Sequence, residues 1–557
     1  MPRDTPASRA TSRIVFGAWS AESLRGTADL SVHELVHDAI TCEVCLQAIS
    51  SIKYLHSCSS VSWNTWPTGT QYAVIENKPH QLMTRRNLFE RTAGLLVAYK
   101  GAALPAESDA SPSAAAILAR IKPPSFPSRD WDVTRYGALA DGKTNSTNAI
   151  QKAVAACSAG GGGRVVIPKG NFFTGAIHLD NNVNLHLAEG ASLLFSTDPK
   201  DYPMVFTRYE GTECMNYSPL IYAFGKTNIA VTGYGILDGQ ASHENWWSWV
   251  RRFTGGAKRG EPSFHSDRDT LGRMGNQRTP VKDRIFGQGH YLRPNFIQPY
   301  RCKNVLLEGF TMRNSPMWEL NPVLCENVTV RNVNINSHGP NNDGCDPESS
   351  RDVLITGCIF STGDDCIAIK SGRNEDGRRV NVPCENVIVQ DCRMKDGHGG
   401  VSIGSEVSGG IKNVYISRCQ MSSPNLQRGL RIKTNSYRGG SIENIHFEHV
   451  MIGQVAEAAV EVDFYYEEGE GGPFRPTVKD IYVAGVSSQK SKYAIYLRGY
   501  TTDPIVGVTL ADCSFADVAK GNFLQNVKSV SVRNVTVNGR PFTTADFTKR
   551  TQSEPGA

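Results

Sequence analysis

The sequence predicts an all-β chain that folds as a parallel β-helix, and a recurring phrase carries this prediction. In each copy, Asn or Asp is followed by alternating apolar and polar residues and then by a turn; copies start at Asn304, Asn327, Asp352, Asn386, Asn413 and Asn444. An alternation with a period of two is typical of β-strands. The starts lie 23, 25, 34, 27 and 31 residues apart, mostly too close for strand–helix–strand crossovers, which take ~30 or more residues. Each strand is therefore expected to stack in parallel on the previous coil.

Weaker copies extend the repeat in both directions, starting at Asn182, Asn228, Asp480, Gly507 and Ser529. The unequal spacing is expected where insertions loop out on one face of a repeat protein. The recurring Asn side chains can form ladders that hold successive coils in register. A leucine-rich horseshoe is the alternative, but its Leu-x-x-Leu-x-Leu spacing is missing.

The first 82 residues show weak periodicity and no clear link to the repeat, and they are predicted to be an upstream segment absent from the mature protein. At Met83 the pattern changes, because Arg85 and Arg86 precede a modest apolar stretch. A twin arginine before such a stretch indicates a twin-arginine export signal over residues 83–106. A Ser/Pro/Ala-rich linker over 107–127 and a β-helix domain over 128–557 complete the expected organisation.

A zinc-like pattern lies in this upstream segment, where His33 and His37 fit HExxH and Cys42 and Cys45 form a CxxC. A metalloprotease would need a surrounding catalytic domain, which the weakly patterned segment does not offer. No metal and no cofactor is expected.

One amphipathic helix is predicted over Asn148–Ala159, ending at Gly160–Gly163, where it would cap the open N-terminal end of the solenoid. The net charge of the 557 residues is only +5, so nothing in the total favours a nucleic-acid partner. No apolar run reaches the ~18 residues that span a bilayer. The 14 cysteines are expected mainly as small buried side chains, with one or two disulfides as the alternative.

Acidic residues concentrate on two adjacent coils. Asp343 and Asp364 are 21 residues apart, close to one coil, and Asp365 follows directly. Stacked coils lie ~4.8 Å apart, so the carboxylates should be neighbours if Gly363 bends the chain. Crowding should raise at least one pKa and leave a neutral acid, as a glycosidase with acid and base roughly 6.5–9.5 Å apart requires. Asp346 and Asp352 are expected as ladder or surface residues.

The following coils add positive groups. His398 lies between glycines, and Arg431 and Lys433 share one strand face because they are two residues apart. Two adjacent cations favour an anion between them, and a sugar carboxylate suits that position.

Four motifs in this order resemble those of family 28 glycoside hydrolases, the polygalacturonase family: Asn341-Asn342-Asp343, Gly363-Asp364-Asp365, Gly397-His398-Gly399 and Arg431-Ile432-Lys433. The family has Thr where this chain has Asn342. The resemblance covers roughly residues 131–539. It implies a right-handed β-helix that hydrolyses α-1,4-galacturonide linkages of pectin with inversion. It also implies Asp364 as acid, Asp343 and Asp365 holding the water, His398 supporting the acid, and Asn341, Arg431, Lys433 and Tyr465 near the substrate.

Two insertions, at about residues 240–291 and 373–384, favour action at chain ends, because long loops beside a cleft can close one end of it. Endo action and hydrolysis of rhamnogalacturonan or xylogalacturonan remain open. Other classes are a calcium-dependent pectate lyase and a non-catalytic carbohydrate-binding solenoid. The expected enzyme is a monomer, exported to the bacterial periplasm or exterior, with a pectic polysaccharide or oligogalacturonide as its partner and without membrane attachment once its signal is removed.

Overall fold

The computed structural model describes residues 60–65, 71–76, 113–250 and 263–547. The chain divides into two units, 1–108 and 109–557. In the first, β1 (Ser60–Thr65) pairs antiparallel with β2 (Gln71–Glu76). The predicted export signal and the HExxH pattern lie outside the described residues. In the described residues, no helix is both long and apolar enough to cross a membrane.

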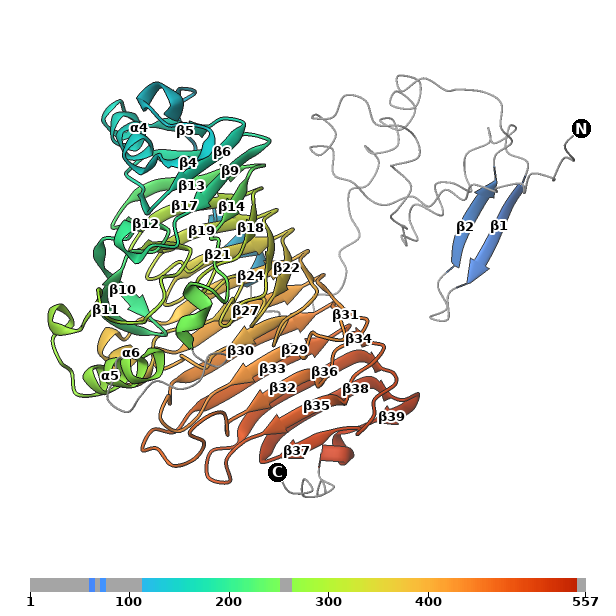
Figure 1. The fold of residues 1–557 in the computed structure, drawn as a ribbon. Helices are drawn as coiled ribbons and strands as arrows, with labels where there is room; N and C mark the ends of the chain where they lie inside the picture. The colour runs from blue at the N-terminus through green and yellow to red at the C-terminus, as the bar shows by residue number, and fades with distance from the viewer. Residues whose placement is uncertain (1–59, 66–70, 77–112, 251–262, 548–557) are drawn as a thin grey trace, which may run out of the picture. The chain divides into compact units, whose positions relative to one another are not determined.

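The second unit is a right-handed parallel β-helix, as predicted, and its coils stack along one axis (Figure 1). Most coils contribute a strand to a long first column of parallel neighbours: β3 (Asp130–Asp132), β5 (Gly163–Ile167), β8 (Val183–Leu187), β13 (Thr227–Gly233), β17 (Lys303–Glu308), β19 (Glu326–Arg331), β21 (Arg351–Thr356), β24 (Cys384–Gln390), β27 (Ile411–Ser417), β30 (Ser441–Glu448), β33 (Thr477–Ala484), β36 (Ile505–Phe515) and β38 (Val527–Val537).

A second column follows the first after a turn: β4 (Asp141–Asn145), β6 (Gly170–Thr174), β9 (Ala191–Phe195), β14 (Ile236–Asp238), β18 (Thr311–Arg313), β20 (Asn334–Ser337), β22 (Ile359–Thr362), β25 (Arg393–Met394), β28 (Gln420–Met421), β31 (Met451–Ile452) and β34 (Ser487–Ser488). The last short strand, β39 (Arg540–Phe542), is antiparallel to β38.

The third column carries the site described below. It begins with β7 (Ile177–His178), β12 (Ile221–Phe224) and β16 (Ile297–Tyr300), and resumes with β23 (Ala368–Ile369), β26 (Val401–Ile403), β29 (Arg428–Lys433), β32 (Ala458–Asp463), β35 (Tyr493–Arg498) and β37 (Phe523–Gln525). Single bridges such as Leu320 to Cys345 and Cys345 to Ile367 continue it through the two intervening coils.

The predicted ladder occupies the start of the first column. Asn304 donates to Asn228 (2.8 Å), Asn327 to Asn304 (2.8 Å) and Asn413 to Asn386 (2.9 Å) through their side-chain amides. These positions also have a left-handed backbone, with φ between 53° and 58° from Asn228 to Asn444, which Asn tolerates better than most residues. The weaker starts Asp480, Gly507 and Ser529 have the same backbone sign. Asn therefore begins most copies of the phrase for two reasons, the turn and the ladder.

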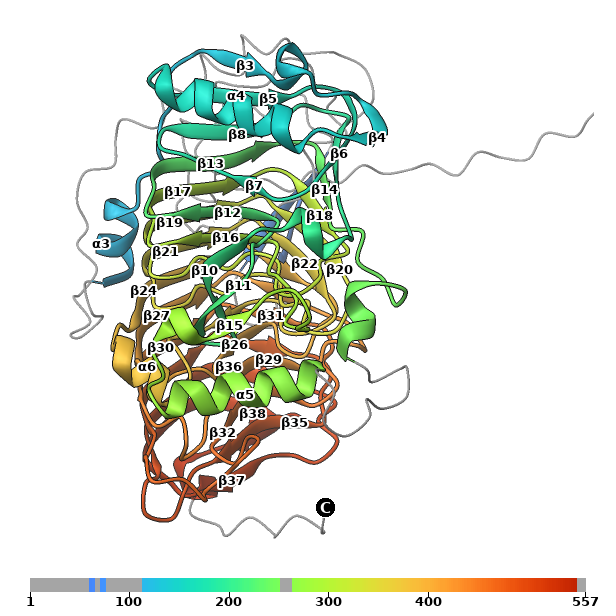
Figure 2. The same cartoon turned by 60° about the vertical axis from the view of Figure 1, so that its left-hand side comes forward.

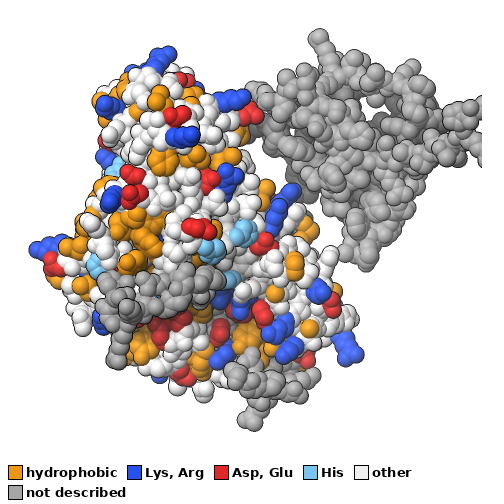
Figure 3. All heavy atoms as spheres, in the orientation of Figure 1, with side chains coloured by type: hydrophobic (Ala, Val, Ile, Leu, Met, Phe, Trp, Pro, Cys, Tyr) orange, Lys and Arg blue, Asp and Glu red, His pale blue; other side chains and the backbone are white. Residues whose placement is uncertain are grey.

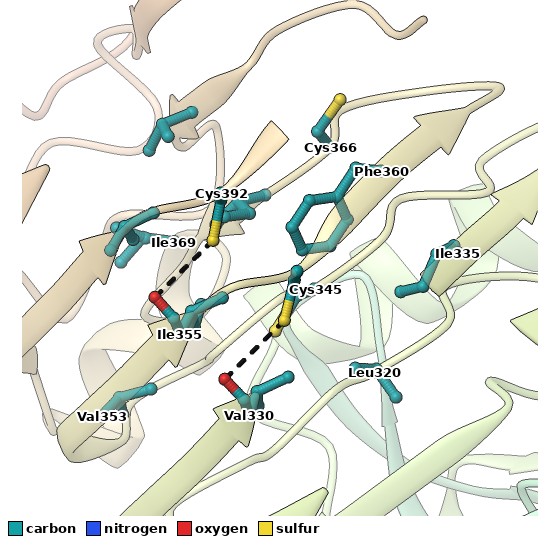
Figure 4. Packing of buried hydrophobic residues seen from close by; sticks show 14 of the residues in the cluster. Leu320, Val330, Ile335, Cys345, Val353, Ile355, Phe360, Cys366, Ile369 and Cys392 are labelled. Carbon is teal, nitrogen blue, oxygen red and sulfur yellow. Dashed lines mark hydrogen bonds between the residues drawn. The ribbon is translucent and has the colours of Figure 1, made fainter. Parts of the chain in front are cut away.

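Apolar side chains from successive coils fill the interior. Val328 of β19 aligns with Val353 of β21 and Val387 of β24, and all three are fully buried. Figure 4 shows Cys345, Cys366 and Cys392 packed with Phe360 and Ile355 in this core. All eleven cysteines among the described residues are buried and unpaired, which confirms the expectation for this part of the chain.

Helix α4 (Thr147–Ala159) covers the first coils, which confirms the predicted cap (Figure 2). A second helix, α3 (Ser113–Arg120), lies within the segment predicted to be a linker. Its Ile117 packs with Ile121, Ile388 and Tyr415 on the outer face of the first column. The Ser/Pro/Ala-rich composition of the segment did not predict this helix, because the helix is stabilised by packing on the apolar patch that it covers.

Candidate active site

The three aspartates predicted to act together do converge. One carboxylate oxygen from each of Asp343, Asp364 and Asp365 lies within 4.8 Å of the other two. The coils are aligned by backbone bonds, because the Gly344 N–H donates to the Asp365 carbonyl (2.9 Å) and the His398 N–H to the Asp364 carbonyl (3.0 Å).

Gly363 permits the tight approach of these coils, because a Cβ there would lie 2.3 Å from the carbonyl oxygen of Gly339. Glycine was expected at this position because the chain bends there; the structure shows that the close contact with the previous coil also requires it. Any side chain at position 363 would push the coil carrying Asp364 away from the one carrying Asp343.

The nearest oxygens of the three carboxylates are closely spaced. A gap of roughly 6.5–9.5 Å was predicted, because a water would lie between acid and base. One oxygen of each carboxylate lies within 4.8 Å of the other two, so the nearest oxygens are closer than this range, which refers to whole carboxyl groups. Stacking of adjacent coils sets the distance between these oxygens.

Asp365 is fully buried and paired with both predicted cations. Lys433 Nζ lies 2.8 Å from its Oδ2, and an Arg431 guanidinium nitrogen lies 3.3 Å from its Oδ1. Burial raises the pKa of Asp365, but Lys433 and Arg431 outweigh burial and hold this pKa below its usual range. An anion therefore already lies between the two cations, and it is Asp365; a sugar carboxylate beside the same cations stays a prediction.

Asp364 is the most exposed of the three, at 19% of its side chain, and His398 Nδ1 lies 2.9 Å from its Oδ1. Burial raises the pKa of Asp364, but the hydrogen bond from His398 and the charges of His398 and Lys433 together outweigh burial and leave this pKa below its usual value. The same hydrogen bond raises the pKa of His398. The pair therefore holds a proton at the edge of the cleft, where His398 is 41% exposed.

Pronounced upward shifts occur instead at Asp343 and Asp346. Burial, and then the charges of Asp346 and Asp364, raise the pKa of Asp343 well above its usual value. Burial raises the pKa of Asp346 to about 8. The prediction that crowding raises at least one pKa is confirmed, but the shift lies on different carboxyls from Asp364.

Asp346 was expected to be a ladder or surface residue, and that expectation is wrong. It is fully buried, 3.6 Å from Lys370 Nζ. Asp352 does join the ladder, since it accepts from the Asn386 amide (3.1 Å). The sequence spacing alone could not distinguish the buried Asp346 from the ladder residue Asp352. The repeated phrase defines the ladder position, but it does not define the conformation of the turn before it.

The asparagines of the first motif differ in position. Asn341 faces the cleft and accepts a hydrogen bond from Arg293 (2.8 Å). Asn342 is fully buried: its amide donates to the carbonyls of Ser315 (3.0 Å) and Met317 (2.9 Å), and its oxygen accepts from the Gly339 N–H (2.7 Å). Asn342 thus fixes the turn that carries Asp343.

A cleft of about 670 Å³ passes over this cluster, on a face where acidic, basic and histidine side chains gather (Figure 3). Asp343, Asp364, His398, Arg431 and Lys433 line it. Further lining residues escaped the sequence analysis; they include His265, Arg268, Trp318, Lys370, Glu406, Arg428 and Tyr466.

Tyr465 was expected near the substrate, but its neighbour Tyr466 is the tyrosine that lines the cleft. The Tyr466 ring lies 5.1 Å from Lys433 Nζ and lines the cleft. Tyr465 does not line it among the described residues; its hydroxyl donates to Glu470 (3.0 Å) and its ring packs on Tyr500. The chain leaves β32 before these residues, so strand alternation gave no guide to their directions.

The first insertion contributes side chains to the cleft from the 3-10 helix η3 (Trp246–Val250) and helix α5 (Phe264–Asn276). Arg268 of α5 binds Glu210 (2.5 Å), and Arg373 binds the same carboxylate (2.9 Å). Both arginines also contact Glu467, at 3.5 and 3.4 Å. These ion pairs fasten α5, the second insertion and the loop after β32 to one another beside the cleft.

Carboxylates this close can hold a hard cation. Here Asp365 already binds Lys433 and Arg431, and Asp343 lies 3.7 Å from Lys370 Nζ. These ammonium and guanidinium groups already balance much of the charge of the buried carboxylates, so the cluster does not depend on a divalent ion for that purpose. The arrangement instead supplies buried carboxylates to activate water and an exposed carboxyl–imidazole pair to move a proton.

Comparison with known proteins gives consistent matches. A model described as glycosyl hydrolases family 28 matches residues 284–539, and one described as rhamnogalacturonase A/epimerase, pectate lyase-like, matches residues 131–187. The structure of a hyperthermoactive exopolygalacturonase from Thermotoga maritima is 42% identical, with 77% of this chain and 96% of that one covered and a TM-score of 0.74.

Two sequence relatives differ in their named mode of action. An exo-poly-alpha-D-galacturonosidase from Dickeya chrysanthemi is 27% identical over 463 residues, covering 74% of this chain and 75% of its own length. An endo-polygalacturonase from Pectobacterium carotovorum subsp. carotovorum is 27% identical over 418 residues, covering 72% and 88%.

Proposed function

Because the chain belongs to family 28 of the glycosyl hydrolases, we propose that it is an exo-acting polygalacturonase, which releases residues from the ends of α-1,4-linked galacturonide chains of pectin. The observation that carries this proposal is the position of Asp343 and Asp364 in a cleft that the first insertion also lines, with Asp365 buried beside them. The resemblance to the exopolygalacturonase from Thermotoga maritima, at 42% identity, supports the same mode of action.

In this mechanism Asp364 protonates the leaving glycosidic oxygen. It is the most exposed of the three carboxyls, and His398 at 2.9 Å supplies a proton from the solvent side. Asp343 and Asp365 hold a water on the cleft side and remove its proton as it attacks the anomeric carbon. Attack opposite the leaving group inverts the anomeric configuration.

Cations along the cleft suit a substrate with one carboxylate per sugar. Arg431 and Lys433 keep Asp365 ionised, and their remaining N–H groups are available to a galacturonate carboxylate at the scissile linkage. Arg428, Arg268 and His265 also line the cleft. Trp318 and Tyr466 offer ring surfaces for the apolar faces of the sugars.

A time course of products from polygalacturonate tests the mode of action. Galacturonate alone from the first minute is the exo result, whereas a ladder of oligomers would reassign the chain to endo action. Activity restricted to rhamnogalacturonan or xylogalacturonan would mean that the proposed substrate, polygalacturonate, is wrong. A product that absorbs in the ultraviolet because it carries a new double bond, together with loss of activity when a chelator is added, would indicate a calcium-dependent lyase.

Proton NMR of the fresh product tests the stereochemistry. Inversion of an α-linkage releases the β-anomer first, and its signal should precede mutarotation. The α-anomer as first product would contradict the assigned water position and indicate a covalent intermediate.

We further propose that the enzyme works outside the cytoplasm as a monomer, with residues 1–82 absent from the mature protein. Replacing Arg85 and Arg86 with Lys should abolish export, because the receptor reads the guanidinium pair. Export of the double variant at the wild-type level would exclude this route, and N-terminal sequencing of the exported protein locates the cleavage site.

A further inference from the structure

A buried lysine that no motif contains lies beside Asp343 and Asp346, at the wall of the cleft. Lys370 follows β23 and is 2% exposed. Its Nζ lies 3.7 Å from Asp343, 3.6 Å from Asp346 and 3.2 Å from Glu406, and it stands 4.6 Å from the centre of the Trp318 ring. A buried ammonium is unfavourable unless anions surround it, so this position has a specific electrostatic purpose.

The pairing of cations with the three aspartates shows which carboxylate depends on Lys370. Asp365 has Lys433 and Arg431, and Asp364 has His398. Asp343 has a single ion pair within the described residues, the one with Lys370. Without that ammonium, a carboxyl that is 3% exposed would face other carboxyls alone.

We infer that Lys370 is a positioning residue of this centre, whose buried ammonium holds Asp343 as an oriented carboxylate for the attacking water. The inference rests on the proposed function, because it concerns the same hydrolysis. Lys370 itself reaches neither the water nor the scissile oxygen in this assignment and acts through Asp343.

The surrounding charges determine the direction of the effect. The titratable and charged groups near Lys370 and Asp343 come from every neighbouring coil: Asp346 and Glu348, Asp364 and Asp365, His398 and Glu406, Arg431 and Lys433, with Arg208 on Glu348 and Arg373 on Glu406. Burial raises the pKa of Asp343, as do Asp346 and Asp364, whereas Lys370 lowers it. Removal of Lys370 should therefore raise this pKa further and favour the protonated form of Asp343.

The test is the pH profile of Lys370→Met, which removes the charge at similar volume. The acid limb of kcat/KM reports ionisation of the base. We expect this limb to move up by at least one pH unit, so that kcat/KM falls tenfold or more on the acid side and recovers toward alkaline pH. KM on the recovered side should stay within twofold of wild type. Lys370→Arg should restore most of the wild-type profile.

A matched control separates this effect from loss of any lysine. Lys412 pairs with Glu385 (2.9 Å) on the first column, with half of its side chain exposed. Lys412→Met should leave the profile unchanged. A uniform loss at every pH in Lys370→Met, or an unmoved acid limb, would overturn the inference and leave Lys370 with a structural role alone.

If Lys370→Met fails to fold, Glu406→Gln serves as the second variant. Glu406 competes with Asp343 for the same ammonium, so its neutralisation should move the acid limb to lower pH. An unmoved limb in this folded variant would also overturn the inference. Wild-type inactivity on polygalacturonate would instead refute the proposed substrate, so the two failures are distinguishable.

Discussion

The same stack of coils presents two very different faces. Along the first column, Asn side chains repeat from coil to coil and bond to one another as neutral amides, as from Asn413 to Asn386 at 2.9 Å. Along the third column, the same spacing brings Asp343, Asp364 and Asp365 within 4.8 Å. Amides at that spacing stabilise the register because each can both donate and accept. Carboxylates at that spacing repel and need cations.

The contrast shows that one geometric property, the distance between coils, serves stability on one face and reactivity on the other. Buried carboxylates with shifted pKa values are typical of functional sites. The neutral ladder supplies the rigid register that holds them together.

The largest expected effect concerns the acid. Asp364→Asn should lower kcat by about 10²–10⁴-fold, because general acid catalysis supplies that much, with KM little changed. A nitrophenyl galacturonide, whose leaving group needs no protonation, should recover much of the rate. Recovery in Asp343→Asn or Asp365→Asn instead would mean that the acid and base roles are exchanged.

A smaller effect is expected at the charged pair beside Asp365. Lys433→Ala removes a charge-assisted hydrogen bond worth about 1.5–3 kcal/mol, or roughly 10- to 150-fold in kcat/KM. Because the ammonium lies 2.8 Å from Asp365, the pKa of that carboxyl should also rise and move the acid limb upward. A pure rise in KM with an unchanged pH profile would show that Lys433 binds substrate alone.

On the neutral face, Asn413→Ala should lower stability without affecting catalysis. The substitution removes two hydrogen bonds of 2.9 Å: the one that Asn413 donates to Asn386 and the one that it accepts from Asn444. The expected loss in the free energy of unfolding is about 1–3 kcal/mol. Ala at φ 57° adds about 1–2 kcal/mol of backbone strain. Asn413→Gly removes the bonds without that strain, so the difference in denaturant midpoints measures the strain. A changed kcat in either variant would contradict the separation of the two faces.

The smallest effect is a pH-dependent stability at His398. Its pKa is raised by the bond to Asp364, so the contribution is complete below the ordinary histidine pKa and is lost as pH rises through the raised value. The melting temperature of His398→Gln should therefore fall below that of wild type at pH 5 and approach it at pH 9. An equal difference at both pH values would mean that the pair is not held by charge.

Much of the site was predictable because its residues lie in short, ordered motifs. Gly363, Asp364 and Asp365 are contiguous, and Asp343 lies close to one coil away. Lys370 and Glu406 were not predictable, because they follow short strands and belong to none of the four motifs. Their ion pairs form only with residues of neighbouring coils. Tyr466 was missed in favour of Tyr465 because the chain had left its strand and turned.

By itself, the sequence determined the architecture and which three carboxylates come together in the candidate site. The period-two alternation dictates strands, the recurring left-handed Asn dictates coils, and one coil of spacing brings Asp343 to Asp364. Only the tertiary structure decided the distribution of charge: that Asp365 is the anion between Arg431 and Lys433, that Asp346 is buried, and that Lys370 is the counter-ion of Asp343. The physical reason is that pKa values depend on burial and on charges from several coils at once, and those distances exist only after the coils have stacked.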